Sequence, residues 1–216
     1  MAVIYCIPGL GADKRLFRNL NLNGHDIHFL EWIPHRRRET ITDYATRLSM
    51  QIEHPNPILI GVSLGGIMSV EISSIIDVKK VILISSLKGG SERPPYMHTQ
   101  KRFNFQRILP VGFMKRFACS LKTMKGAQDP NDIEIFRSMI HGTNSQFFRW
   151  AIGQVLHWEH PGVSAPCAHF HGANDFLIPH KNIKDVHLLP AESHFMFSEK
   201  THLLEPLIRK EIDMMT

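Results

Sequence analysis

The hydrophobic residues of this chain form six short apolar runs, separated by stretches in which hydrophobic positions recur every three or four residues. Short apolar runs bounded by glycine, proline or asparagine are typical of strands buried on both faces of a sheet. Spacings of three and four residues are typical of helices that bury one face. The predicted strands are residues 2–9, 25–33, 57–62, 80–87, 166–173 and 185–191.

Helices are predicted between or after several of these strands. Residues 40–52 place their hydrophobic side chains on one helical face, and Thr40 or Thr42 can cap the start. A second helix follows directly after Ser63, and residues 196–214 form a third. Strands that alternate with helices predict an α/β fold, with a mostly parallel central sheet of about six strands and helices on both faces.

Residues 88–165 depart from this alternation. They hold Phe, Met and Trp at helical spacings and contain no clear strand, and they fall between two predicted strands. We therefore expect a core of residues 1–87 and 166–216 with a helical cap of residues 88–165. The aromatic residues expected to pack within the cap, some of them around a substrate, are Phe103, Phe105, Phe113, Phe117 and those of residues 146–150.

The charge of the chain is concentrated in this predicted cap. The net charge is +5, and residues 88–165 hold 11 Lys and Arg against 5 Asp and Glu. Such a segment favours an acidic partner or substrate, although a solvated basic surface has the same composition. A second basic run lies at residues 35–40. The pI of 9.2 and this run do not make a nucleic-acid-binding module, so no nucleic acid is expected.

Composition also limits the location of the protein. No apolar run approaches the roughly 20 residues of a membrane span, so no membrane partner is expected. The first residues lack a basic leader, and three scattered cysteines imply no disulfide framework. We expect a cytoplasmic protein that is a monomer or a homodimer.

Residues 61–65, Gly-Val-Ser-Leu-Gly, stand where a predicted strand ends and a helix begins. A serine between glycines at such a junction indicates a sharp turn, because bulky neighbours would keep the strand and helix apart. The turn lifts the Ser63 hydroxyl out of the sheet, beside the start of the helix. The pattern predicts a nucleophilic serine, and its structural alternative is a small residue at a tight turn.

A nucleophilic serine needs a base, and the base needs an acid that orients it. On a parallel sheet both are expected at the carboxyl ends of later strands. Asp175 follows the strand at 166–173, and His194 follows the strand at 185–191. The structural alternatives are an Asx turn at Asp175 and, in a chain with 14 histidines, a surface role for His194.

Four segments resemble those of the small bacterial α/β-hydrolases. They are IPGLGADKRLF after the first strand, GVSLGG at the turn, HGANDFLIP around Asp175 and ESHFMF around His194. The resemblance covers nearly everything outside the cap and implies the α/β-hydrolase fold. It also implies that the backbone N–H groups of Leu10 and Leu64 form an oxyanion hole.

The resemblance implies a serine hydrolase that cleaves carboxylic esters or thioesters through an acyl-enzyme. A serine at the turn argues against haloalkane dehalogenase and epoxide hydrolase chemistry, which uses a carboxylate nucleophile in this fold, while lyase or perhydrolase activity stays an alternative. No metal or organic cofactor is expected. Neither the histidines of residues 157–160 nor the pair His169 and His171 has a third ligand at suitable spacing.

The expected partner is a small acyl ester or thioester. A further hypothesis is that the basic cap binds an acidic carrier protein that bears the acyl group, as in the ester-cleaving step of biotin precursor synthesis in some relatives. The alternative to an enzyme is a catalytically weak or inactive binding protein on the same scaffold. Two departures favour it: Pro8 stands where many relatives have histidine, and residues 191–193 replace the glycine before His194.

Overall fold

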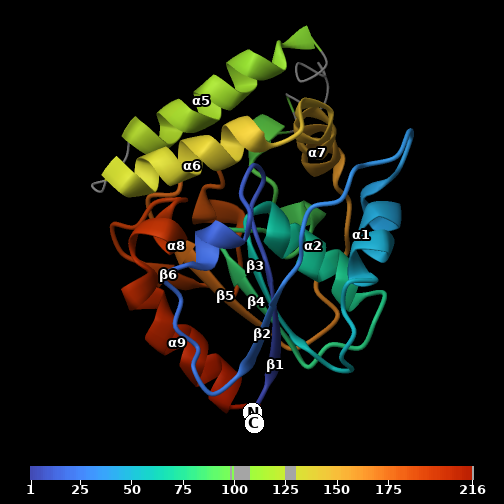
Figure 1. The fold of residues 1–216 in the computed structure, drawn as a ribbon, viewed down its shortest axis with the longest axis vertical. Helices are drawn as coiled ribbons and strands as arrows, with labels where there is room; N and C mark the ends of the chain where they lie inside the picture. The colour runs from blue at the N-terminus through green and yellow to red at the C-terminus, as the bar shows by residue number, and fades with distance from the viewer. Residues whose placement is uncertain (98, 100–107, 125–129, 216) are drawn as a thin grey trace.

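The core is a single sheet of six parallel strands with helices on both faces (Figure 1). The computed structural model describes residues 1–97, 99, 108–124 and 130–215. The strands, in the sheet order β2-β1-β3-β4-β5-β6, are β2 (Asp26–Phe29), β1 (Val3–Ile7), β3 (Ile58–Val62), β4 (Lys80–Ile84), β5 (Cys167–Gly172) and β6 (His187–Leu189). All five pairings are parallel, so the predicted sheet is confirmed.

The helices divide into those that cover the sheet and those that lie between β4 and β5. The first group is α1 (Ile41–Ser49), α2 (Leu64–Ser73), α8 (Met196–Glu199), α9 (Thr201–Asp213) and the short 3-10 turns η1 (Lys14–Phe17) and η3 (His180–Asn182). The second group is η2 (Gly90–Glu92), α5 (Val111–Met124), α6 (Pro130–Gly142) and α7 (Ser145–His157). Among the described residues, no helix is long and apolar enough to span a membrane, and no disulfide joins the three cysteines.

Alternate residues of each strand enter two separate cores. Ile4, Ile60 and Ile82 pack with Leu204 and Ile208 of α9 on one face. The residues between them, together with α1 and α2, form the second core on the other face. Figure 1 shows this arrangement, with α8 and α9 on one side of the sheet and α1 and α2 on the other. Burial on both faces explains why the strands read as continuous apolar runs.

The predicted helix at 196–214 is two helices in the structure. It breaks at Lys200, whose φ of −129° and ψ of 36° lie outside the helical region. The Thr201 hydroxyl donates to the Phe197 carbonyl, which a continuous helix would offer to a backbone N–H. The short helix α8 therefore ends at Glu199, and α9 begins at Thr201.

The described part of residues 88–165 contains helices and no strand, as the spacing predicted. Figure 1 shows α5 and α6 lying across the end of the sheet at which the strands finish, while α7 lies beside α1. Trp158, which follows α7, is buried and contacts the core: its Nε1 donates to Glu71 Oε1 of α2 at 2.7 Å. The final part of the segment thus packs into the core beneath it.

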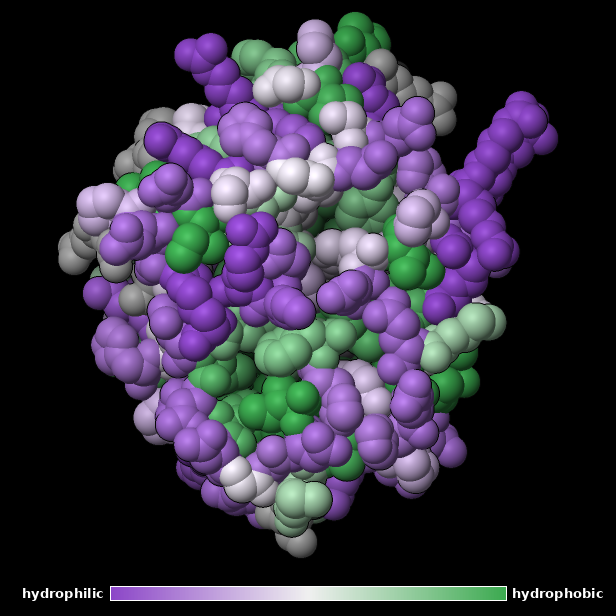
Figure 2. Space-filling view, in the orientation of Figure 1, coloured by the Kyte–Doolittle hydropathy of each residue, from purple (hydrophilic) through white to green (hydrophobic). Residues whose placement is uncertain are grey.

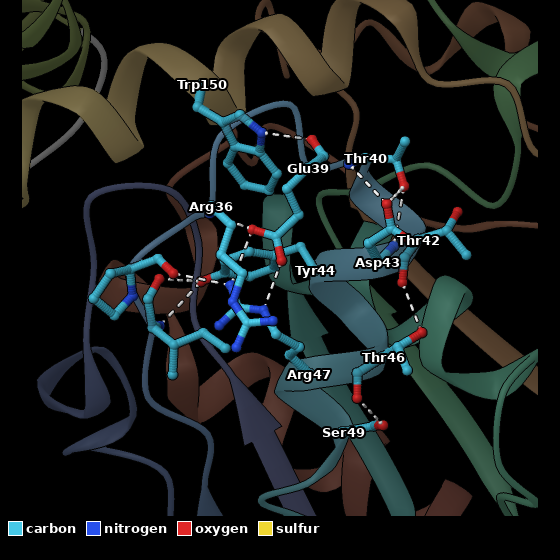
Figure 3. A network of polar contacts seen from close by, with 12 residues as sticks. Arg36, Glu39, Thr40, Thr42, Asp43, Tyr44, Thr46, Arg47, Ser49 and Trp150 are labelled. Carbon is cyan, nitrogen blue, oxygen red and sulfur yellow. Dashed lines mark hydrogen bonds and ion pairs between the residues drawn. The ribbon is translucent and has the colours of Figure 1, made fainter.

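A polar network holds α7 against the segment that leads into α1 (Figure 3). Trp150 Nε1 donates to the Glu39 carbonyl at 3.1 Å. The Glu39 carboxylate accepts from Arg47 through Nε at 2.6 Å and Nη2 at 2.9 Å, and from the Arg36 backbone N–H at 2.6 Å. Burial works to raise the pKa of Glu39, but these donors outweigh it and hold the pKa below its usual value. The charge therefore stays in place at neutral pH.

The basic run at residues 35–40 lies in the segment between β2 and α1. The side chains of Arg36, Arg37 and Arg38 are exposed. Figure 1 shows this segment projecting at the upper right, and Figure 2 shows hydrophilic side chains projecting at the same place. Hydrophilic residues also cover most of the rest of this face, with hydrophobic ones in small groups between them (Figure 2).

Candidate active site

The strand β3 ends in a sharp turn that carries Ser63 in a strained conformation. Ser63 has φ of 52° and ψ of −116°, and α2 begins at the next residue. Two hydrogen bonds hold the turn: the Ser63 N–H donates to the Ile84 carbonyl at 2.9 Å, and the Ser86 hydroxyl donates to the Ser63 carbonyl at 2.7 Å. Non-glycine residues keep such dihedrals only where the surroundings fix them.

The glycines on each side of Ser63 allow the strand and the helix to meet. A Cβ on Gly61 would overlap the Gly65 carbonyl oxygen, and a Cβ on Gly65 would overlap the Ile7 carbonyl oxygen at the end of β1. Helix α2 therefore packs directly on the backbone of β1 and β3. These two strands flank the point where the order of the sheet reverses, which is where ligands bind in open α/β sheets.

Of the three side chains predicted to act together, Ser63 and Asp175 each lie within hydrogen-bond distance of His194. His194 Nε2 is 3.0 Å from Ser63 Oγ, and His194 Nδ1 is 2.7 Å from Asp175 Oδ2. Asp175 is fully buried and His194 is nearly so. The carboxylate facing Nδ1 favours a proton there, which leaves the Nε2 lone pair facing the serine. This is the arrangement that a nucleophile, a base and an orienting acid require.

Asp175 is surrounded by hydrogen-bond donors. Its Oδ1 accepts from the Ile178 N–H at 2.8 Å, while its Oδ2 faces both His194 and, at 3.1 Å, His171 Nε2. Burial works to raise the pKa of Asp175, but the charge of His194 and the hydrogen bonds from His171 and His194 outweigh burial and hold the pKa well below its usual range. The buried carboxyl group therefore stays ionised.

Sequence analysis named His171 only as a possible metal ligand and did not indicate its contact with Asp175. His171 is completely buried, and its Nε2 also faces the Ile178 carbonyl at 2.7 Å, so this nitrogen carries a proton. Its Nδ1 lies 3.4 Å from His169 Nε2. Burial, with the nearby His171 and Lys88, lowers the pKa of His169 to about 3, so this histidine stays neutral. The sequence signal for this pairing was the two-residue period of the strand, which puts His169 and His171 on one face.

The two residues expected to supply an oxyanion hole come from segments next to Ser63. Leu64 is the first residue of α2, so its N–H is among those that a helix leaves without an intrahelical partner. Leu10 follows Gly9, and a Cβ on Gly9 would lie 3.5 Å from Ser63 Cβ. The loop after β1 thus passes close to the serine.

Trp32 is a second residue that sequence analysis missed. Its Nε1 donates to the carbonyls of Gly9 at 3.3 Å and Ala12 at 3.1 Å, and the Ala12 N–H also donates to the Gly9 carbonyl at 3.1 Å. The peptide between Gly9 and Leu10 is trans, so its carbonyl and N–H point in opposite directions. Trp32 and the Ala12 N–H therefore together hold the peptide that carries the Leu10 N–H. No sequence signal connects Trp32 to this loop.

An apolar cavity of about 480 Å³ opens beside Ser63 and His194. Besides these two, Ser198 supplies the only other side-chain hydroxyl or charged group among the described lining residues. The walls come from both the core, with Leu16 and Phe197, and the helices between β4 and β5. The lining side chains from α5, α6 and α7 include Phe113, Phe117, Phe136, Ile140 and Phe148.

The aromatic residues predicted to pack within residues 88–165 have different surroundings. Phe113, Phe117 and Phe148 line the cavity, whereas Phe147 and Trp150 pack against Tyr44 of α1. Phe103 and Phe105 lie outside the described residues.

Known structures share this architecture at low sequence identity. An esterase from Thermogutta terrifontis is 17% identical, with a TM-score of 0.76 over 100% of this chain and 90% of that one. A carboxylesterase structure from Nitrososphaera gargenis is 17% identical, with a TM-score of 0.77 over 99% and 90%. ClbQ from the colibactin NRPS/PKS pathway is 17% identical, with a TM-score of 0.66 over 99% and 98%. No protein-family model and no curated protein matches the chain. The likenesses show that the chain has the α/β-hydrolase fold, which it shares with these structures.

The close packing at the turn predicts a large cost for one added methyl group. We expect Gly65→Ala to lower the free energy of unfolding by about 3 kcal/mol, because the methyl group meets the rigid backbone of β1. Urea unfolding followed by circular dichroism measures the change. Gly112→Ala in α5 is the matched control, since a Cβ there has no atom within 4 Å, and it should leave stability unchanged or raise it by up to about 1 kcal/mol. Equal stability of the two variants would contradict the packing argument.

Proposed function

We propose that this chain is a serine hydrolase that cleaves carboxylic esters or thioesters through an acyl-enzyme. The observation that carries the proposal is the continuous hydrogen-bonded series from Ser63 Oγ through His194 to Asp175, at 3.0 and 2.7 Å, at the mouth of an apolar cavity. In this proposal His194 takes the Ser63 proton as the hydroxyl attacks the acyl carbon. Asp175 keeps the imidazole oriented and stabilises its cation.

In the rest of the proposed reaction His194 acts first as an acid and then again as a base. The protonated His194 gives its proton to the leaving alcohol or thiol, and the acyl group stays on Ser63. Water then loses a proton to His194 as it attacks the acyl-enzyme, and the acid leaves as Ser63 recovers its proton. The N–H groups of Leu10 and Leu64 stabilise the oxyanion in both steps.

The cavity supports an uncharged acyl chain as the group held beside Ser63. Its volume of about 480 Å³ lies within the range of small-molecule sites. A carboxylate or ammonium at the far end of the chain would lose its water without gaining a charged partner from the described lining residues. We therefore propose esters or thioesters of medium-length, unbranched or lightly branched acyl groups as the substrate class.

The first prediction of this proposal concerns labelling and turnover. A fluorophosphonate probe should label the protein, and p-nitrophenyl esters of about four to eight acyl carbons should react faster than the acetate, because they fill more of the apolar cavity. Ser63→Ala should abolish labelling and lower kcat at least about 10³-fold, and His194→Ala should lower both sharply.

The same labelling and hydrolysis assays supply a control variant and the result that would contradict the proposal. Ser145→Ala changes an exposed serine at the start of α7, outside the cavity lining, and should label like the original protein. If the folded protein neither labels nor hydrolyses any ester of the series, the alternative of an inactive binding protein on this scaffold replaces the enzyme.

A second prediction follows from the hydrogen bonds of Trp32. Trp32→Phe keeps an aromatic ring against Phe147 and removes the donor to the Gly9 carbonyl. The peptide that carries the Leu10 N–H then loses one support, so kcat should fall about 10-fold while KM changes little. This loss is smaller than the 10²–10³-fold cost of removing an oxyanion donor outright.

Trp150→Phe is the matched control for this prediction. It also removes one indole N–H, whose acceptor is the Glu39 carbonyl, outside the cavity. Its kcat should match that of the original protein. An unchanged kcat in Trp32→Phe, or the same loss in both variants, would remove Trp32 from the proposed mechanism.

We further propose that the acyl group is presented on an acidic carrier protein. The excess of Lys and Arg in residues 88–165 supports this partner, and one similar structure is ClbQ from an NRPS/PKS pathway. Not all of this charge faces outward. Arg93 is buried against Glu159, and Lys115 donates to the carbonyls of His141 and Thr143. The outward charge on described residues includes exposed Arg116 and Arg137. The side chains of Lys101, Arg102, Arg107, Lys122 and Lys125 lie outside the described residues.

The carrier proposal predicts a specific effect of salt. Raising the ionic strength from about 0.01 M to about 0.15 M shortens the screening length from about 30 Å to about 8 Å. The value of kcat/KM for an acyl group on an acidic carrier should then fall about 10-fold, because attraction speeds the encounter. The same change should hardly affect a neutral p-nitrophenyl ester. An equal response of both substrates would exclude the carrier as partner and leave the hydrolase proposal intact.

A further inference from the structure

A cluster of two histidines and one carboxylate lies at the edge of the sheet, apart from the candidate active site. Asp26 begins the edge strand β2, His28 lies two residues later on the same face, and His54 comes from the connection between α1 and β3. His28 pairs with Tyr5, in the middle of β1. The candidate active site, in contrast, lies beyond the carboxyl ends of the strands. The proposed hydrolysis makes no use of these three side chains.

The spacing of the donor atoms resembles that of ligands around one metal ion. His28 Nε2 is 3.0 Å from Asp26 Oδ2 but forms no hydrogen bond, although this nitrogen is buried. Ligands bound tetrahedrally to Zn²⁺ at about 2.0–2.1 Å lie roughly 3.3 Å apart. His54 Nε2 is 4.0 Å from Asp26 Oδ2, and all three donor atoms lie within 4.8 Å of one another. A movement of about 1 Å by the partly exposed His54 completes the set.

Tyr5 orients both imidazole rings. Its ring stacks on His28, with centroids 4.8 Å apart and planes 19° apart. Its hydroxyl lies 2.8 Å from His54 Nδ1 and also accepts from the Glu53 N–H at 3.0 Å. When the His54 Nδ1–H donates to this oxygen, Nε2 keeps its lone pair for a metal. Partners of this kind fix the tautomer and ring direction of histidine ligands.

We propose that Asp26, His28 and His54 form a binding site for a divalent transition-metal ion of the Zn²⁺ type, with water as a fourth ligand. The side chains of His28, His54 and Asp26 are 35%, 39% and 41% exposed, so the site borders solvent. Two imidazoles and one carboxylate suit Zn²⁺ and its neighbours better than Mg²⁺ or Ca²⁺, which prefer oxygen ligands. The bound ion joins the edge strand β2 to the connection before β3.

Metal binding to the intact, untagged chain tests this proposal. After treatment with a chelator, the protein is titrated with Co²⁺, followed by visible absorption, and with Zn²⁺, followed by calorimetry. We expect one equivalent to bind, with the absorption of Co²⁺ held by nitrogen and oxygen ligands. His28→Gln and His54→Gln should each weaken binding about 100-fold or more, and Tyr5→Phe, which changes only the partner of a ligand, about 10-fold.

His187→Gln is the matched control, because this exposed histidine lies on β6 at the opposite edge of the sheet. It should bind the ion like the original chain. Circular dichroism establishes that each variant is folded, and ester hydrolysis, measured in parallel, should not depend on the metal. Failure of the original chain to bind one equivalent, or equal binding by folded His28→Gln, His54→Gln and His187→Gln, would overturn the site. Neither result would affect the proposed hydrolase.

Discussion

The close approach of α2 to the backbone of β1 and β3 is the constraint on which the candidate site depends. It is possible because Gly61 and Gly65 leave no Cβ between the helix and the strands. The turn between them holds Ser63 at a positive φ, and the hydrogen bonds to Ile84 and from Ser86 offset part of the cost of that conformation. The position of the hydroxyl is therefore set by backbone packing, so the other two side chains have a fixed point to reach.

A second constraint is the burial of the Asp175 carboxylate near Ser63 and His194. An ionised carboxyl group without partners is expensive to bury, and Asp175 has donors on both oxygens, from Ile178, His194 and His171. His169, behind these donors, is neutral and adds no further charge to the interior. The same set of contacts that makes the carboxylate tolerable in the interior also directs one of its oxygens at His194. Stability of the charge and orientation of the imidazole thus come from one arrangement.

The strands, the turn at Ser63 and the order of the three polar residues could be predicted because each depends on neighbours in the sequence. Apolar runs and glycine spacing are local signals, and parallel strands bring their carboxyl ends together whatever the loops contain. The predicted strands were longer than the observed ones. Residues 2–9 were predicted where β1 is Val3–Ile7, and residues 80–87 were predicted where β4 is Lys80–Ile84. Residues 8–9 and 85–87 remain buried but belong to the loops that follow the strands, where burial no longer means pairing in the sheet.

Contacts between distant segments could not be predicted in this way. The Trp32 indole N–H donates a hydrogen bond to the Gly9 carbonyl, and the two residues lie in different loops. The spacing of apolar residues cannot indicate a hydrogen bond between two loops. The same is true of His28 and His54, which come together only because β2 pairs with β1, where Tyr5 contacts both rings. Sequence spacing detects metal ligands only when they lie on one element or in one short motif.

The fold separates two kinds of chemistry by the direction of its strands. Helices and loops gather beyond the carboxyl ends, where residues from β3, from the connection after β5 and from the helices between β4 and β5 form one cavity. The edge strand β2, in contrast, is only four residues long, is partly exposed and pairs with a neighbouring strand on one side alone. Edge strands need a feature that prevents fraying or pairing with another chain. An ion bound by Asp26, His28 and His54 meets that need without using any group that faces the cavity, so its contribution is to the stability of the edge.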